Sequence, residues 1–147
     1  MLRDGYADHL GPNGESRDED DIPPAATTFT GTVTITITVT LKTTALTNIT
    51  CTEEVSVLDN ASSPRSIDES NTVAATGTGA TRTCKLSIPY AWSLLTQASD
   101  SMATGYSVSG FTGTSGLPQR TSSFVPLDTR KVPANGATTA LTAAVTL

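Results

Sequence analysis

The fold class is decided by TFTGTVTITITVTLKT, residues 28–43, in which threonine alternates with branched apolar residues. Successive side chains of a β-strand point to opposite faces, so this period of two predicts a strand with one apolar and one polar face. The apolar face consists of Val33, Ile35, Ile37, Val39 and Leu41. The run is longer than the usual strand of about five or six residues. We therefore expect it to bend and serve two sheets, or to project beyond the domain.

The composition agrees with an all-β fold in a single domain. The chain has 147 residues, of which 37% are hydrophobic, 5% aromatic and 16% charged. Threonine, serine, alanine and glycine fill much of the remainder, whereas a helical bundle would be richer in leucine, glutamate and lysine. Short strands with polar faces and small-residue loops are the structure that this mixture favours.

Further alternating segments bring the expected total to about seven strands. They lie at residues 48–59, on both sides of a hairpin turn at Gly77-Thr78-Gly79, around 104–110, at 122–132 and at 137–147. The pair Asn135-Gly136 predicts the turn that precedes the last strand.

Three features interrupt this pattern. Glu53 stands on the apolar face of its strand and suggests a bulge or a strand end. Pro89 should end regular pairing, because proline has no N–H to donate. Trp92 and Leu95 lie three residues apart, so a helical turn is expected in the segment around them.

About seven short strands separated by turns predict a β-sandwich with Greek-key connections. Two inward-facing cysteines, Cys51 and Cys84, a single tryptophan, Trp92, and the strand that carries Tyr106 and Val108 add to this pattern. Over roughly residues 28–147 the chain thereby resembles an immunoglobulin-like domain. It departs from antibody domains in one respect, because Trp92 follows the second cysteine instead of lying between the two. Domains of this kind decorate many bacteriophage heads and tails and occur in bacterial adhesins, so the resemblance implies a role in an assembly.

The two cysteines leave two alternatives open. Cys51 and Cys84 fall on apolar faces of different expected strands. A disulfide between them would contribute about 3–4 kcal/mol by the chain-entropy estimate. Two free, buried thiols are the other alternative, because a protein made in a reducing cytoplasm begins with its cysteines reduced.

Charge and motifs exclude several classes of function. The net charge is -5, and the few lysines and arginines form no basic stripe, so nucleic-acid binding is not expected. No apolar window is long enough to span a bilayer. His9, the single histidine, lies in a polar segment, and no G-x-S-x-G motif occurs. We expect no enzyme activity, cofactor, metal site, membrane partner or small-molecule substrate.

Residues 1–26 form a separate polar segment ahead of the predicted domain at residues 27–147. The segment has no strand or helix period, contains glycine and proline, and is predicted to be an extended arm that binds a partner. The alternative is an arm that folds back on its own domain. Its binding residues are predicted to be Asp18, Glu19, Asp20, Asp21 and Ile22. The start of the chain lacks the apolar stretch of a secretion signal. We therefore expect a protein made in the host cytoplasm and released with virions.

The end of the chain supplies a second candidate for contact between subunits. Its alternating residues predict a strand that adds to the sheet edge of a neighbour, as in strand complementation. These residues are Leu141, Ala143, Val145 and Leu147. The alternative is an ordinary strand of the chain's own sheet, with a wet threonine face.

These observations together predict a non-enzymatic structural protein of a virion. It would decorate or cement a phage capsid or tail through the arm and the sheet edges, with the major capsid or tail protein, or copies of itself, as partners. The alternative is a subunit of a bacterial or archaeal extracellular filament or adhesin, located at the cell surface and assembled by strand exchange.

Overall fold

The computed structural model describes residues 25–61, 63–95, 100–113 and 120–147 and contains eight strands there. The strands are β1 (Thr27–Thr40), β2 (Asn48–Asp59), β3 (Arg65–Ala74), β4 (Thr81–Leu94), β5 (Ser101–Phe111), β6 (Arg120–Thr121), β7 (Val125–Lys131) and β8 (Ala137–Thr146). The described ranges contain no helix, which confirms the all-β prediction. None of them therefore holds a helix that could cross a membrane.

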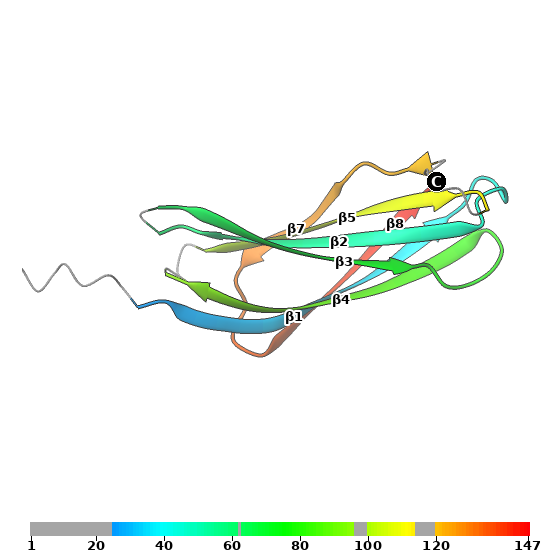
Figure 1. The fold of residues 1–147 in the computed structure, drawn as a ribbon. Helices are drawn as coiled ribbons and strands as arrows, with labels where there is room; N and C mark the ends of the chain where they lie inside the picture. Colours follow the sequence, from blue (N-terminus) through cyan, green and yellow to red (C-terminus); the bar gives the residue numbers. More distant parts are fainter. Residues whose placement is uncertain (1–24, 62, 96–99, 114–119) are drawn as a thin grey trace, which may run out of the picture.

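The strands form two sheets that pack face to face as a sandwich (Figure 1). The three-stranded sheet has the order β4-β1-β8, and the five-stranded sheet has the order β3-β2-β5-β6, with β7 also paired to β5. The structure therefore has eight strands where the sequence predicted about seven, because the two-residue β6 lies in a segment expected to be a loop.

The long strand β1 is the centre of the three-stranded sheet. It pairs antiparallel with β4 over its full length, from Thr27↔Leu94 to Thr40↔Thr81, and parallel with β8 from Gly31↔Ala137 to Thr40↔Thr146. The expectation that it bends to serve both sheets, or projects beyond the domain, is wrong. Its length is used instead to supply apolar side chains to the whole core.

The core consists of two clusters that follow one another along the sandwich. Ile35, Ile37 and Val39 of β1 belong to the first cluster. Phe29 and Val33 of the same strand belong to the second, which also contains the stacked rings of Tyr90 and Trp92, 4.1 Å apart between centroids. The apolar face predicted from the alternation in residues 28–43 is therefore buried. Burial of each large apolar side chain stabilises the fold by about 1.5–3 kcal/mol.

A disulfide joins the two sheets within the first cluster. Cys51 of β2 and Cys84 of β4 are bonded, with their Cα atoms 6.2 Å apart. Of the two alternatives that the sequence leaves open, the structure has the bridge. Because β2 and β4 belong to different sheets, the bond connects the layers directly.

Pro89 does not end regular pairing, contrary to the expectation. β4 continues to Leu94, and Pro89 is aligned with Thr32 of β1. The reason is that β4 is an edge strand, where a proline nitrogen can face away from the neighbouring strand. The same extension places Trp92 within β4, so the helical turn expected there is also wrong for the described residues.

The glycine turn at residues 77–79 does not close a hairpin within one sheet. Gly77 and Gly79 have positive φ values of 103° and 76°, as expected for a turn. However, β3 pairs with β2, and β4 pairs with β1, so the turn carries the chain from one sheet to the other. Near the turn, an isolated bridge pairs Thr76 with Thr83.

Removal of the disulfide should lower the free energy of unfolding. The bond closes a loop with a sequence separation of 33 residues, for which the chain-entropy estimate is about 3–4 kcal/mol. We expect a loss of that size when Cys51 and Cys84 are both replaced by alanine, measured by urea unfolding. A reductant should destabilise the unaltered chain and leave the double variant unchanged. Equal stability of the two proteins without reductant would contradict the prediction.

Candidate functional site: the β8 edge

The sandwich exposes strand edges, and all but one carry residues that discourage pairing with another chain. Charges and prolines protect an edge, because an added strand would have to bury a charge or face a missing N–H. Among the described residues, the edge strands β3, β4, β6 and β7 carry such residues, namely Arg65, Asp68, Glu69, Arg82, Lys85, Pro89, Arg120, Pro126, Asp128, Arg130 and Lys131.

β8 is the exception. Its sequence, ATTALTAAVT, is ten residues long and contains no charged residue, no proline and no glycine. Among the residues that the structure describes, its one strand partner is β1, which leaves the other side of β8 without a partner strand. A long, uncharged edge of this kind is a template for pairing with another strand.

The hydrogen bonds show which backbone groups face this open side. At the end of β8, the N–H of Leu147 donates to the carbonyl of Thr40, and the carbonyl of Leu147 accepts from the N–H of Lys42. Because successive residues of a strand alternate, odd-numbered residues of β8 direct their backbone N–H and C=O groups toward β1. Even-numbered residues direct these groups outward, to the open edge of the sheet. The outward residues are Thr138, Ala140, Thr142, Ala144 and Thr146. One outward carbonyl, that of Ala144, accepts a hydrogen bond from the Tyr106 hydroxyl at 3.3 Å.

The apolar side chains of β8 are only partly covered. Leu141, Ala143 and Val145 pack against the core but remain partly exposed, whereas Leu147, just after the strand, is buried. On the opposite side of the sandwich, two hydrogen bonds connect β3 of one sheet to β4 of the other. Trp92 Nε1 donates to Glu69 at 2.9 Å, and the Asn71 side chain donates to the carbonyl of Ser87 at 3.1 Å. The sandwich is therefore less completely covered along β8 than along the side where β3 faces β4.

The residues predicted to pair between subunits thus lie in or beside β8, where the structure pairs them with their own β1. Whether a neighbouring subunit also pairs with them stays a prediction. The residues predicted to bind a partner from the arm, Asp18, Glu19, Asp20, Asp21 and Ile22, lie outside the described residues.

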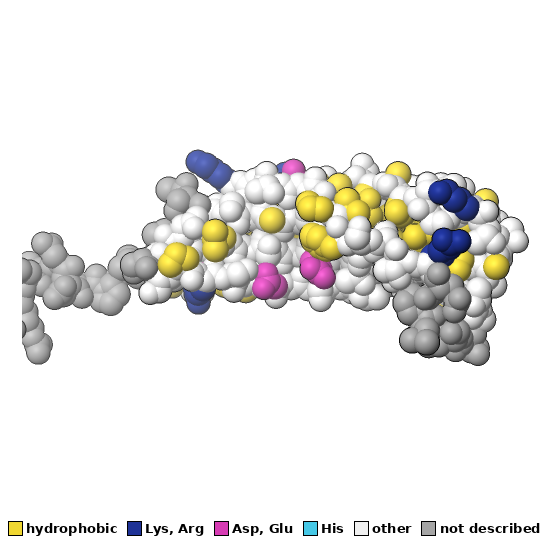
Figure 2. All heavy atoms as spheres, turned by 90° about the horizontal axis from the view of Figure 1, so that it is seen from above, with side chains coloured by type: hydrophobic (Ala, Val, Ile, Leu, Met, Phe, Trp, Pro, Cys, Tyr) yellow, Lys and Arg dark blue, Asp and Glu magenta, His cyan; other side chains and the backbone are white. Residues whose placement is uncertain are grey.

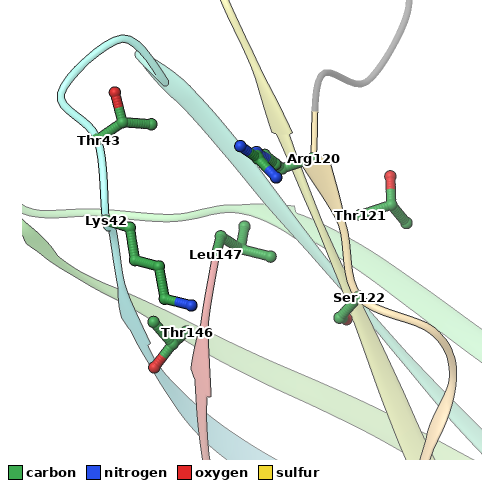
Figure 3. A pocket seen from close by; sticks show the side chains of 7 residues that line it. All are labelled: Lys42, Thr43, Arg120, Thr121, Ser122, Thr146 and Leu147. Carbon is green, nitrogen blue, oxygen red and sulfur yellow. The ribbon is translucent and has the colours of Figure 1, made fainter.

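A pocket of about 340 Å³ lies beside the end of β8 (Figure 3). Its lining combines two cations, Lys42 and Arg120, with hydroxyl groups and Leu147; the hydroxyl residues are Thr43, Thr121, Ser122 and Thr146. This lining holds neither a carboxylate side chain nor a histidine to act as a base beside a hydroxyl nucleophile. The described lining of the pocket therefore contains no set of groups for nucleophilic catalysis.

A second groove runs over the outer face of the five-stranded sheet. Phe124 lies directly on Gly105 of β5, where an added Cβ atom would come within 2.1 Å of the ring. The ring is 49% exposed, and carboxylates of Glu54 and Asp68 line the groove beside it. Figure 2 shows this face, on which hydrophobic side chains gather and acidic ones lie nearby. No pattern in the sequence predicted this groove, although a glycine inside a strand, here Gly105, is a signal that another group approaches the backbone closely.

Glu53 is buried in the sandwich, contrary to the expectation of a bulge or strand end. β2 keeps an unbroken register through Glu53, which is aligned with Asn71 of β3 and Tyr106 of β5. Its side chain is fully buried, and neither carboxylate oxygen has a hydrogen-bond partner among the described residues. Burial raises the pKa of Glu53 from 4.5 to about 7, because an apolar surrounding disfavours the charged form. Among the described residues, no group of three or more histidine, cysteine or acidic side chains could hold a metal ion.

Comparisons with known proteins give no relative from which to infer a function: no family model, no curated protein and no solved structure matches the chain.

The stability of the fold should fall as the pH rises from about 4.5 to about 7. Over this interval the unfolded chain releases the Glu53 proton while the folded chain retains it. The free energy of unfolding therefore falls by about 3 kcal/mol in total. We expect Glu53→Gln, which is neutral at every pH, to remove most of this dependence. The measurement is the melting temperature at pH 5 and pH 8.

Glu54→Gln provides the matched control, because Glu54 is the exposed neighbour on the opposite face of β2. It should keep the pH dependence of the unaltered protein. An identical pH profile for the unaltered protein and Glu53→Gln would show that Glu53 is not the group responsible.

Proposed function

We propose that this chain is a non-enzymatic structural protein that joins an assembly through sheet-edge pairing and through its N-terminal arm. Its setting in the proposal is the surface of a virion, where it decorates or cements a phage capsid or tail. The partners are the major capsid or tail protein and copies of the chain itself.

The observation that carries the proposal is the contrast between β8 and the other edges. A monomer that works alone gains nothing from a ten-residue edge without a charge or a proline, and such an edge exposes it to aggregation. The same edge is useful to a subunit whose neighbour covers it. Charged and proline residues on β3, β4 and β7 restrict pairing to one side, as a defined assembly requires.

The disulfide and the buried core support a structural role as well. Cys51 and Cys84 connect the two layers, so a load applied to one sheet is transmitted to the other through a covalent bond. The described lining of the pocket beside β8 offers cations and hydroxyl groups but no carboxylate or histidine side chain to act as a base, so it supports catalysis less well than the edge supports assembly.

A filament or adhesin subunit at the cell surface is the second candidate. It is favoured by the edge position of β8, which has one described partner strand, β1. An edge strand gives up fewer strand pairings than a central strand when it leaves its own sheet and enters that of a neighbour. In this alternative β8 is exchanged between copies instead of serving as a docking edge.

Deletion of residues 1–26 separates the role of the arm from that of the sandwich. β1 begins at Thr27, so the shortened protein keeps all of the described strands, and we expect its melting temperature to stay within a few degrees of the full chain's. Its attachment to capsids or tails isolated from the source should fall at least tenfold, measured by co-sedimentation and mass spectrometry. Unchanged attachment would refute the anchoring role of the arm. Recovery of the full chain in cell-surface filaments, and not with virions, would favour the second candidate.

A further inference from the structure

We infer that the open edge of β8 pairs antiparallel with the β8 edge of a second copy of this chain, so that two three-stranded sheets become one continuous sheet. This inference rests on the proposed assembly function and names the partner of the same edge. The combined order would be β4-β1-β8 followed by β8-β1-β4 of the second copy, six strands formed from two sheets of three. Sheets of about this size are common in proteins.

The geometry of β8 permits this pairing about a two-fold axis. Outward N–H and C=O groups belong to even-numbered residues, so each even residue must be aligned with an even residue of the second copy. An axis at Leu141 meets this condition, since it aligns Thr142 with Ala140 and Ala144 with Thr138 of the second copy. The same register keeps every inward side chain on the core side.

The register also gives the partly exposed apolar residues a neighbour. Leu141 lies beside its own copy at the axis, and Val145 is aligned with Ala137 across the pair. Cross-strand apolar pairs of this kind add a few tenths of a kcal/mol to about 1 kcal/mol each. The open edge thus has both backbone and side-chain reasons to accept a second β8.

Charge favours a second β8 over the other segments of the chain as the occupant. β8 has no charged residue, so two copies meet without local repulsion although the chain carries a net charge of -5. The segment of residues 1–26 carries the acidic run at residues 18–21 and several glycines and prolines, which disfavour a strand. The edges of β3, β4 and β7 carry charges or prolines, as described above.

The association should be modest in strength. Four aligned pairs of even residues provide about eight backbone hydrogen bonds, and two of these, one for each copy, compete with the Tyr106 hydroxyl for the Ala144 carbonyl. A single strand pair is small beside stable interfaces, which bury about 1,200–2,000 Å². We therefore expect a dimer at micromolar to millimolar concentration, a range in which many copies on a shared lattice would pair readily.

The test uses the full chain and two lysine variants. Thr142→Lys places a charge near the axis, on the solvent-exposed face of β8. Thr81→Lys places the same charge on the solvent-exposed face of β4, the other edge strand of the same sheet. Sedimentation equilibrium should give a concentration-dependent dimer for the unaltered chain and Thr81→Lys. Thr142→Lys should raise the dissociation constant at least tenfold, with its melting temperature measured to confirm that it folds.

Amide hydrogen exchange on the unaltered chain provides a direct readout that needs no variant. The N–H groups of Thr138, Ala140 and Thr142 face outward, so their exchange should slow as the protein concentration rises. A monomer at about 1 mM, or a dimer without protection of these amides, would overturn the inference. If the monomer's β8 amides become protected when isolated capsids or tails are added, the self-pairing fails while the proposed function stands. Absence of protection in both experiments, together with no attachment, would reject both.

Discussion

Burial of one face of β1 is the constraint on which the rest of the structure depends. β1 is hydrogen-bonded on both sides, to β4 and β8, and its apolar side chains reach both core clusters. A shift of one residue in its register would turn the threonines inward and the isoleucines and valines outward. The strict alternation therefore fixes which face of β1 is buried and excludes a one-residue shift against either neighbour.

The interior of the sandwich contains a buried glutamate, Glu53, among its apolar side chains. Glu53 occupies a position on the inner face of β2 that valine or isoleucine could fill, and its carboxyl group has no described partner. A buried polar group without a hydrogen bond costs stability, and the cost rises when the group is charged. The fold tolerates Glu53 as the neutral acid, which links the stability of the sandwich to pH.

The edges divide the surface into protected and open parts. Where β3 faces β4, the sandwich is closed by side-chain contacts between sheets, and the strands there carry charges or a proline. Along β8 no other described strand pairs with the outward backbone groups, and one of them, the carbonyl of Ala144, accepts a hydrogen bond from the Tyr106 hydroxyl. The proposed assembly uses one edge and not the others because of this distribution, since backbone pairing itself is indifferent to sequence and must be restricted by side chains.

The alternation of apolar and polar residues in the sequence was sufficient to determine the all-β class and the buried face of β1. It also located the strands β1, β2, β5 and β8. These features could be predicted because alternation in a strand is a property of neighbouring residues. Three results depended on tertiary structure instead. Glu53 and Pro89 looked like interruptions, but the two partner strands of β2 and the edge position of β4 hold both in regular pairing. The parallel pairing of β8 with β1, which creates the open edge, joins residues more than 100 positions apart. No local pattern specifies such a pairing, because it is selected by burial of the whole core.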